Sequence, residues 1–354
     1  MEISFSKLKE DEREYFLEVA RSNFNFVQKF FLGLEDDVLV AKKKGKILGG
    51  VVIKKTDLGF KKIGVISWIF TVKEARGKGI ASRLLDKAVE HLKFLGHDEI
   101  VASVDGSNTS SSKLFEKKNF VIQSFYSQLK KYGVGYFNLA SKTNQFFNQG
   151  SFIWVLSKEK VRENKYYDLG FSIFINFLAG LILFYSPINY IFNASLLVIM
   201  ISIFLLHFVR FFSMKLASKV LNYKSVFRSW PSGFLTSLIG SGFGLYIASP
   251  GNFFPLDKGW KYKDYVPSLS KISSIGVSSV LAVVLISIIL QSVVISPFFV
   301  SLFQSIKYLG LSLVVFDLFL FFKPFNNTNG KRIFDFNKTI FAILALIVII
   351  AFIL

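Results

Sequence analysis

The chain has 354 residues, a formal net charge of +19, 52% hydrophobic residues and no cysteine. This composition excludes a disulfide framework, thiol catalysis and a Cys zinc site, and the mean hydropathy of +0.46 is unusual for a water-soluble protein. Both halves are basic and no aromatic-basic recognition motif stands out, so we expect no nucleic acid as a partner and attribute the charge to a lipid bilayer.

Charge and hydropathy divide the chain near residue 165. Residues 1–165 contain 29 Lys and Arg against 19 Asp and Glu, whereas residues 166–354 contain 14 against 5, strung between long apolar stretches. The first 30 residues are charged, which is not the pattern of a cleavable signal peptide. The front part is therefore expected to stay on the side of the membrane where it is synthesised.

The front part alternates strand and helix patterns, which predicts a mixed α/β domain. Short β-rich runs bounded by turn residues predict strands, and apolar residues at helical spacing, as at Leu84, Leu85, Ala88 and Leu92, predict helices. In chain order the expected elements are a strand at 3–8, a helix at 11–22, strands at 38–41, 47–53 and 63–72, a helix at 81–96, a strand at 99–104, a helix at 110–120, and strands at 121–129 and 151–157.

The stretch EARGKGIA, residues 74–81, joins the expected strand 63–72 to the helix that follows it. A helix start presents unpaired backbone N–H groups and the positive end of the peptide dipoles, which together hold an anion. Gly77 and Gly79 let the backbone approach closely, Arg76 and Lys78 add positive charge, and Ala81 keeps the first turn slim. The pattern predicts a phosphate-binding loop, although such a loop by itself is also an ordinary turn.

Two spaced motifs make the front part resemble the GNAT superfamily of N-acetyltransferases. That family's pyrophosphate loop reads Q/R-x-x-G-x-G/A, and Arg76, Gly79 and Ala81 fill its three places. The family's second signature, N-x-x-A-x-x-L-Y-E-K-x-G-F, is similar to NTSSSKLFEKKNF, which matches at Asn108, Leu114, Glu116, Lys117 and Phe120 and departs at Ser111, Phe115 and Asn119. The resemblance covers residues 1 to 157.

The resemblance implies acetyl-CoA as the co-substrate and an amine as the acyl acceptor. It places the coenzyme's pyrophosphate on the backbone N–H groups of the loop and its pantetheine beside the preceding strand. The implied cofactor-binding residues are Ile69, Phe70, Thr71, Arg76, Gly77, Lys78, Gly79, Ile80, Ala81, Ser82 and Asn108.

The catalytic residues are left open by the sequence. The helix Tyr that often protonates the leaving thiolate in this family is replaced by Phe115, and the strand around Trp68 offers no Glu as a base. Tyr126, Tyr132 or Tyr136 could serve this chemistry, or they are ordinary half-buried tyrosines with no catalytic role. Binding of acyl-CoA is therefore better supported than catalysis.

The back part contains six apolar segments near the length that a bilayer core of about 30 Å requires. They lie at about 170–186, 190–212, 232–249, 274–298, 302–322 and 338–354. If all six crossed, two Lys- and Arg-rich loops would lie outside the cell. If the Gly-rich segment 232–249 is re-entrant, every charged loop falls on the cytoplasmic side. We therefore expect five crossings, with six as the alternative.

Two ionisable residues, Lys307 and Asp317, lie within the fifth apolar segment. Charged groups at membrane depth are costly and have functional or paired roles. Ten residues of helix rise by about 15 Å, so these two side chains do not pair directly with each other. We expect Lys307 to extend to the membrane interface and Asp317 to be held by a polar neighbour, with a part in binding a substrate as the alternative.

The back part resembles a site-2-protease-like intramembrane metalloprotease of the archaeal sort. The resemblance rests on YKSVFRSWPSG leading through a glycine-rich stretch to SPG, and on PFNNTNGKRIFDFNK. Zinc hydrolysis needs two His one helical turn apart, a carboxylate ligand and a Glu base. Arg210, Phe211, Met214 and Asn329 stand at the corresponding positions, and starting the register at His207 does not restore the motif. We expect a scaffold without metal and without protease activity.

The sequence therefore predicts an α/β GNAT-like domain over 1–157, a basic linker at 158–167, and an all-α polytopic membrane domain over 168–354. The predicted function is a membrane-anchored N-acetyltransferase whose front domain faces the cytoplasm and whose amine substrate, a small molecule or membrane-associated protein, is unknown. The alternative is a non-catalytic sensor or adaptor that responds to acyl-CoA on an inactive intramembrane protease scaffold.

Overall fold

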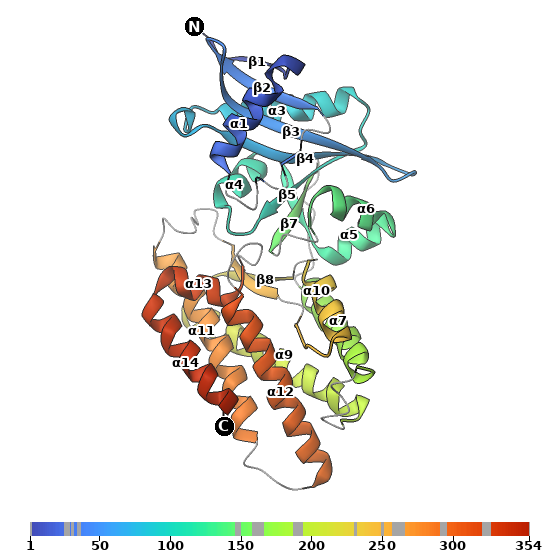
Figure 1. The fold of residues 1–354 in the computed structure, drawn as a ribbon, viewed down its shortest axis with the longest axis vertical. Coiled ribbons are helices and arrows are strands. Elements are labelled where there is room, and N and C mark those ends of the chain that lie inside the picture. Colours follow the sequence, from blue (N-terminus) through green and yellow to red (C-terminus); the bar gives the residue numbers. More distant parts are fainter. Residues whose placement is uncertain are drawn as a thin grey trace.

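The computed structural model describes residues 2–24, 29, 32–33, 37–145, 150–157, 166–186, 194–229, 232–248, 251–256, 266–290, 296–320 and 327–353. Figure 1 shows a sheet domain at the N-terminal end of the molecule and a bundle of helices at the C-terminal end. This arrangement confirms the fold class expected from the sequence. The predicted linker at 158–167 lies outside the described residues except for its last two positions.

The N-terminal domain is built on a seven-stranded sheet with the order β1-β2-β3-β4-β5-β7-β6. Neighbouring strands are antiparallel except β4 and β5, which run parallel and are joined by a helical crossover. The strands are β1 (Ser4–Lys7), β2 (Val38–Lys43), β3 (Lys46–Asp57), β4 (Lys62–Thr71), β5 (Glu99–Asp105), β6 (Phe120–Gln123) and β7 (Ser151–Leu156).

Helices cover both faces of this sheet (Figure 1). On one face, α3 (Ile80–Phe94) and α4 (Thr109–Lys117) pack on the sheet, and the predicted stripe of α3 is buried against residues of β3 to β5. On the other face lie α1 (Arg13–Asn23), α5 (Phe125–Tyr132) and α6 (Gly135–Lys142). Two short 3₁₀ helices, Glu10–Glu12 and Lys73–Ala75, precede α1 and α3.

The expected strand at 121–129 is wrong over most of its length. The strand β6 ends at Gln123, and Ser124 begins α5 because its hydroxyl accepts a hydrogen bond from the backbone N–H of Ser127 at 3.2 Å. The aromatic and apolar residues that resembled a strand are instead the buried face of a helix, with Phe125 and Tyr132 packed under the sheet.

The C-terminal domain consists of seven described helices and one two-stranded sheet. Four helices, α7 (Tyr167–Phe184), α9 (Leu196–Val220), α11 (Val266–Ile289) and α12 (Pro297–Phe319), are long and apolar enough to cross a membrane. The 16-residue α14 is apolar but shorter than these four. The remaining elements are α10 (Ser232–Gly242), α13 (Asn329–Phe336), α14 (Lys338–Ile353), β8 (Ser225–Ser229) and β9 (Gly251–Pro255).

The Gly-rich segment 232–249 begins with a short helix. With 11 residues, α10 spans about 16 Å, roughly half of the hydrocarbon core of a bilayer. Residues 243–248 are not helical, and β9 of the two-stranded sheet starts at Gly251. This shape fits the expectation that the segment does not cross. The sheet of β8 and β9 was not predicted from the sequence.

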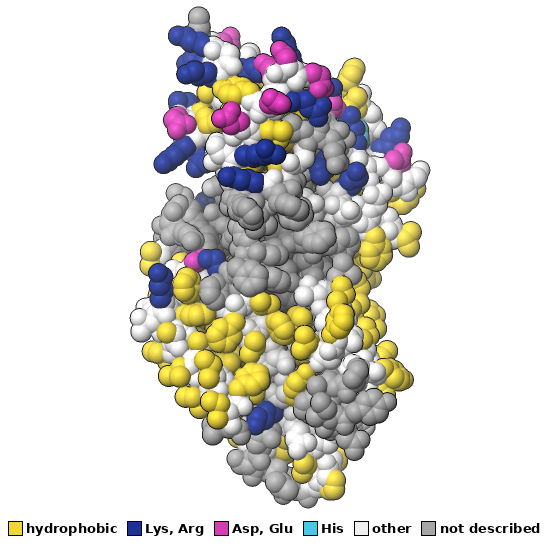
Figure 2. Space-filling model, in the orientation of Figure 1, with side chains coloured by type: hydrophobic (Ala, Val, Ile, Leu, Met, Phe, Trp, Pro, Cys, Tyr) yellow, Lys and Arg dark blue, Asp and Glu magenta, His cyan; other side chains and the backbone are white. Residues whose placement is uncertain are grey.

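The outer surface of the helical domain is apolar. Figure 2 shows charged side chains gathered over the sheet domain and hydrophobic side chains spread over the helical end. On α9, Phe204, Phe208 and Phe212 form an exposed row at a spacing of four residues. An apolar surface of this extent is rare on soluble monomers. Lipid contact explains the surface better than water does.

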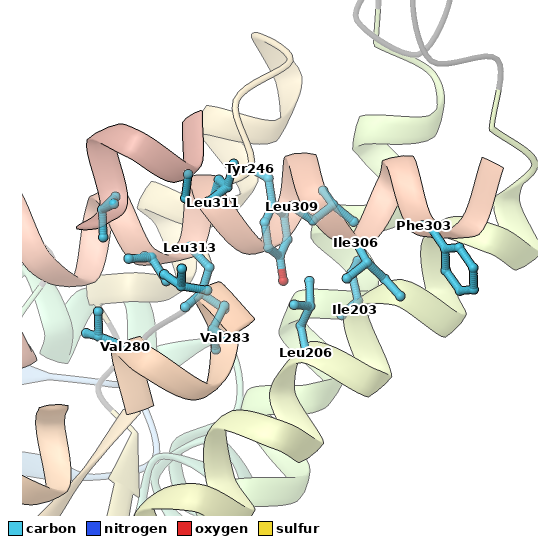
Figure 3. Close-up of a cluster of buried hydrophobic side chains, with 14 of the residues drawn as sticks. Ile203, Leu206, Tyr246, Val280, Val283, Phe303, Ile306, Leu309, Leu311 and Leu313 are labelled. Atoms are coloured by element: carbon cyan, nitrogen blue, oxygen red, sulfur yellow. The ribbon is translucent and has the colours of Figure 1, made fainter. Parts of the chain in front are cut away.

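The largest buried cluster of the helical domain draws on α7, α9, α11, α12 and α14, and Figure 3 labels members of it from α9, α11 and α12. Three of these helices approach closely at Gly310 of α12. A Cβ atom there would meet the Ser287 hydroxyl of α11 and would lie 3.0 Å from Leu206 Cδ2 of α9. Small residues at helix contacts allow such close approach.

We predict that Gly310→Ala lowers the stability of the helical domain by about 1–3 kcal/mol, because the added methyl group overpacks the contact. The matched control is Gly170→Ala in α7, where a Cβ meets no described atom within 4 Å. That change should be neutral or stabilise by up to about 1 kcal/mol through helix propensity. Thermal unfolding of the full chain in detergent measures both, and equal midpoints for the two variants would contradict the packing argument.

A second structural contact joins β1, β3 and α3 around Asp37, just before β2. Its carboxylate lies 2.6 Å from Lys7 Nζ, 2.7 Å from Lys55 Nζ and 2.9 Å from His91 Nε2. Burial raises the pKa of Asp37, but the hydrogen bonds from His91, Lys55 and Lys7 outweigh it and hold that pKa well below the usual range.

A carboxyl group whose pKa is lower in the folded chain stabilises the fold above its unfolded pKa, and the effect is lost as the pH falls. We therefore predict that Asp37→Asn lowers the unfolding temperature at pH 7. The difference from the unaltered chain should shrink as the pH falls below about 4. Thermal unfolding at several pH values tests this, with the exposed Asp11→Asn as the control. A difference that is independent of pH would contradict it.

Candidate functional site

A gap opens between the two parallel strands at the centre of the sheet. The pairing of β4 with β5 runs from Ile63 and Glu99 to Ile66 and Ala102 and stops there. Beyond Ile66, β4 continues for five residues to Thr71, and beyond Ala102, β5 continues for three. The strand ends therefore separate, and their facing backbone groups are not used in the sheet between them.

The gap leads to the loop singled out by the sequence. The helix α3 begins at Ile80 with Gly79 as its N-cap, at φ 74°, and Gly77 is also left-handed at φ 78°. Such φ values favour glycine. The amides of Ile80, Ala81 and Ser82 lie in the first turn, where helix geometry provides no acceptor for them. The loop thus directs backbone donors and the positive end of the helix toward the same space.

The cationic side chains of this loop are partly tied to backbone. Arg76 Nε donates to the Thr71 carbonyl at 3.3 Å, and Lys78 Nζ donates to the Glu74 carbonyl at 3.0 Å. Both side chains stay exposed. A Cβ atom on Gly77 or Gly79 would meet no described atom within 4 Å, so the space above the loop is open. An anion could approach this backbone from solvent.

Three buried polar atoms on β4 and β5, beyond the last paired residues, have no hydrogen-bond partner among the residues that the structure describes. They are Trp68 Nε1, Thr71 Oγ1 and Ser103 Oγ. Buried polar groups are normally hydrogen-bonded, so such atoms call for a ligand or water. The gap, the glycine loop and these three atoms fit a long, polar ligand that carries a phosphate group at one end.

The predicted residues Ile69, Phe70 and Thr71 lie on β4 beyond the last residue paired with β5, and their role in binding stays a prediction. Asn108 has an additional structural task, because its side chain caps α4 by accepting a hydrogen bond from Ser111 N at 3.2 Å. Phe115 on α4 is buried and contacts Phe120 edge-on, with ring centroids 5.0 Å apart. It supplies no proton to the site.

The three candidate tyrosines lie away from the separated strand ends. Tyr132 is buried under the sheet and donates a hydrogen bond to Glu99, which is the first residue of β5, at the paired end of that strand. Tyr136 is buried in the same cluster, and Tyr126 is exposed and contacts Tyr167 of α7 with centroids 4.9 Å apart. Burial and the neighbouring Glu99 carboxylate raise the pKa of Tyr132. A catalytic role for them stays a prediction.

A second polar cluster lies inside the helical domain and was not predicted as a cluster. We call Arg210, Asn252, Asp317 and Asn329 the buried polar centre. Arg210 donates to Asp317 at 3.1 Å and to the Gly251 carbonyl at 2.8 Å. Asn329 donates to Asp317 through its side chain at 2.7 Å and its backbone at 3.0 Å. Asp317 thus has polar partners, one of the two roles expected for it.

Comparisons with known proteins bear on the sheet domain. Residues 5–120 match the model of the acetyltransferase (GNAT) family. The N-alpha-acetyltransferase MAK3 of Arabidopsis thaliana is 29% identical over 97 residues, which are 27% of this chain and 51% of the relative. The chain thus spans about half the length of that curated relative. The N-terminal domain thus resembles the acetyltransferase (GNAT) family over residues 5–120.

Two similar solved structures are an IAA acetyltransferase from Bacillus cereus ATCC 14579 and the NatC complex bound to Gag peptide and CoA. The first is 24% identical with a TM-score of 0.30, covering 35% of this chain and 79% of its own. The second is 18% identical with a TM-score of 0.33, and the match covers 45% of this chain and 100% of the chain in that structure. At these TM-scores the similarity supports no argument of its own.

Among the described residues, no group of three or more His, Cys, Asp or Glu is placed to hold a metal ion.

We predict that Tyr132→Phe lowers the stability of the sheet domain by about 1–3 kcal/mol, because it removes a hydrogen bond from the buried Glu99 carboxylate. Tyr126→Phe, at an exposed position, should change stability by less than about 0.5 kcal/mol. Thermal unfolding measures both variants. A Tyr132→Phe variant that unfolds like the unaltered chain but no longer transfers acetyl groups would instead assign this hydroxyl to chemistry.

Proposed function

We propose that this chain is an N-acetyltransferase that binds acetyl-CoA between β4 and β5 and transfers its acyl group to an amine. The observation that carries the proposal is the end of strand pairing at Ile66 and Ala102, next to the glycine loop that begins α3. The GNAT family match over residues 5–120 supports the same conclusion. The curated relative's name favours an α-amine as the acceptor.

The residues around the gap have separate roles in such a reaction. The first-turn amides of α3 and the charge of Arg76 hold the diphosphate, while the free backbone N–H groups of β4 polarise the acyl carbonyl. Ser103 and Thr71 offer hydroxyls that orient the bound chain. When bound, acetyl-CoA supplies a thioester whose carbonyl carbon is open to attack by an amine. The C–N bond then forms and the C–S bond breaks, and the proton that the amine nitrogen loses balances the one that the leaving CoA thiolate takes up, so positioning contributes most.

We further propose that the helical domain anchors the enzyme in a membrane with the sheet domain on the cytoplasmic side. The connections between α7 and α9 and between α11 and α12 contain no Lys or Arg. The end of α9, the segment through β8, and α13, on the side of the sheet domain, contain Lys219, Lys224, Arg228, Lys331 and Arg332. Positively charged connections prefer the cytoplasmic side. This distribution supports the orientation.

A second candidate function is an acyl-CoA-responsive sensor without catalysis. The observation that favours it is the buried Phe115, which puts a phenyl ring where the resemblance implies an acidic hydroxyl.

We also infer that the helical domain is a metalloprotease-like scaffold without metal. Arg210 and Asn329, which stand at the positions of two implied metal ligands, both contact Asp317, so the fold brings these positions together.

We predict that Arg76→Glu and Gly79→Glu each weaken acetyl-CoA binding by at least about tenfold, which corresponds to at least about 1.4 kcal/mol. Each change places a carboxylate where the diphosphate would bind, and Gly79→Glu also forces a side chain into a left-handed conformation. Lys130→Glu, an exposed charge reversal on α5, is the control and should bind normally. Calorimetric titration of the full chain in detergent measures the affinities.

Release of CoA in the presence of amines separates the two candidate functions. An acetyltransferase releases CoA when a suitable amine is added, and the two loop variants lose that release together with binding. Binding of acetyl-CoA without release above background for any α-amine peptide or small amine would favour the sensor. Unchanged affinity in both loop variants would remove the proposed site.

A further inference from the structure

One amide side chain of the helical domain hydrogen-bonds to the sheet domain at the end of β5, a strand of the proposed acyl-CoA site. Asn327 lies just before α13, and its side chain is buried. Its amide Nδ2 donates to Asp105 Oδ1 at 3.1 Å and to the Gly150 carbonyl at 3.1 Å. Asp105 is the last residue of β5, and Gly150 directly precedes β7. The amide thus bridges the ends of two paired strands.

The carboxylate that accepts this hydrogen bond organises the turn from β5 into α4. Asp105 Oδ1 also accepts from the backbone N–H and the hydroxyl of Ser107, each at 2.7 Å. The Asp105 carbonyl accepts from Asn108 N at 2.8 Å, and Asn108 then caps α4. The strand β5 is one wall of the gap. Moving Asp105 therefore moves both the wall and the start of the neighbouring helix.

The contact at Gly150 is close enough to leave no room for adjustment. A Cβ atom on Gly150 would lie 2.5 Å from Asn327 Cβ and 2.6 Å from its Cγ. Next to it, Phe254 of β9 contacts Phe152 of β7 at a centroid distance of 5.0 Å, with the rings at 88°. At Gly150 itself, a displaced Asn327 has no free space to move into, so its displacement is passed to the start of β7.

On its other side Asn327 is tied to the buried polar centre. Its carbonyl accepts from Asn252 Nδ2 at 3.2 Å, and the same nitrogen donates to Asn329 Oδ1 at 2.8 Å. Asn329 in turn holds Asp317, which Arg210 also contacts. Hydrogen bonds strengthen in such a low-dielectric interior, and a partly broken network is costly. Asn327 is therefore held in place from α9 and α12.

We propose that Asn327 is a positioning residue for the acetyltransferase site, through which the helical domain sets the separation of β4 and β5. The inference rests on the proposed function, since it assumes that acetyl-CoA binds in the gap. The helical domain then contributes to affinity for acetyl-CoA without touching it. Because such coupling is reciprocal, occupancy of the gap also favours one arrangement of the buried polar centre.

The test compares acetyl-CoA affinity in variants of the full chain in detergent. Asn327→Asp places a second carboxylate against Asp105, and Asn327→Ser removes the amide without adding charge. Each should raise the Kd for acetyl-CoA by about fivefold or more. The double change Asp105→Asn with Asn327→Asp restores the amide–carboxylate hydrogen bond but not the one to the Gly150 carbonyl, and should recover part of the affinity. Asn337→Asp, the same substitution at an exposed cap of α14, should have no effect.

Recovery in the double variant identifies positioning, because a general loss of packing would not be reversed by exchanging the two groups. If Asn327→Asp fails to fold, Asn327→Ser decides the question. Folded Asn327 variants with the affinity of the unaltered chain would overturn the inference and leave the proposed function intact. An unaltered chain that binds no acetyl-CoA would overturn the proposed function, and this inference with it.

Discussion

The architecture of the sheet domain depends on where one parallel strand pair stops. Four residue pairs hold β4 to β5, and beyond Ile66 and Ala102 the two strands continue without each other. A strand end that leaves its ladder exposes backbone donors and acceptors that need other partners. Here those groups face a helix N-terminus whose glycines permit close approach. A ligand that is polar along its length and anionic at one end satisfies both features together.

In the helical domain the central polar groups are enclosed by protein. They therefore need hydrogen-bond partners inside the domain. Charges at membrane depth persist only with partners, and the Arg210–Asp317 ion pair with Asn329 and Asn252 supplies them. A buried ion pair by itself is weak evidence for stability. The consequence of this network is that each amide side chain is held in one orientation, because its nitrogen donates and its oxygen accepts. The network extends through Asn327 to the sheet domain.

The contact between the two domains combines these hydrogen bonds with aromatic packing. Phe125 of α5 meets Phe171 of α7 edge-on at 4.5 Å, and Phe254 of β9 joins the apolar cluster under α3 and α4. Arg332 donates to the Phe253 carbonyl at 2.7 Å and lies over the Phe254 ring at 4.6 Å. Such desolvated contacts favour one relative placement of the domains. A helical domain joined in this way is part of the frame around the proposed site, in addition to its proposed role as an anchor.

Local patterns in the sequence determined the strands up to β5, the amphipathic α3 and the glycine loop, because periodicity and turn chemistry act over a few residues. They also determined that the back part is apolar and helical. The sequence misassigned residues 124–129, where the cap at Ser124 starts a helix, and it gave no sign of the β8–β9 sheet. Only the tertiary structure decided where β4 and β5 separate, that Arg210 meets Asp317 across 107 residues, and that Asn327 meets Asp105 across 222. Such contacts depend on how whole elements pack, and no local spacing encodes them.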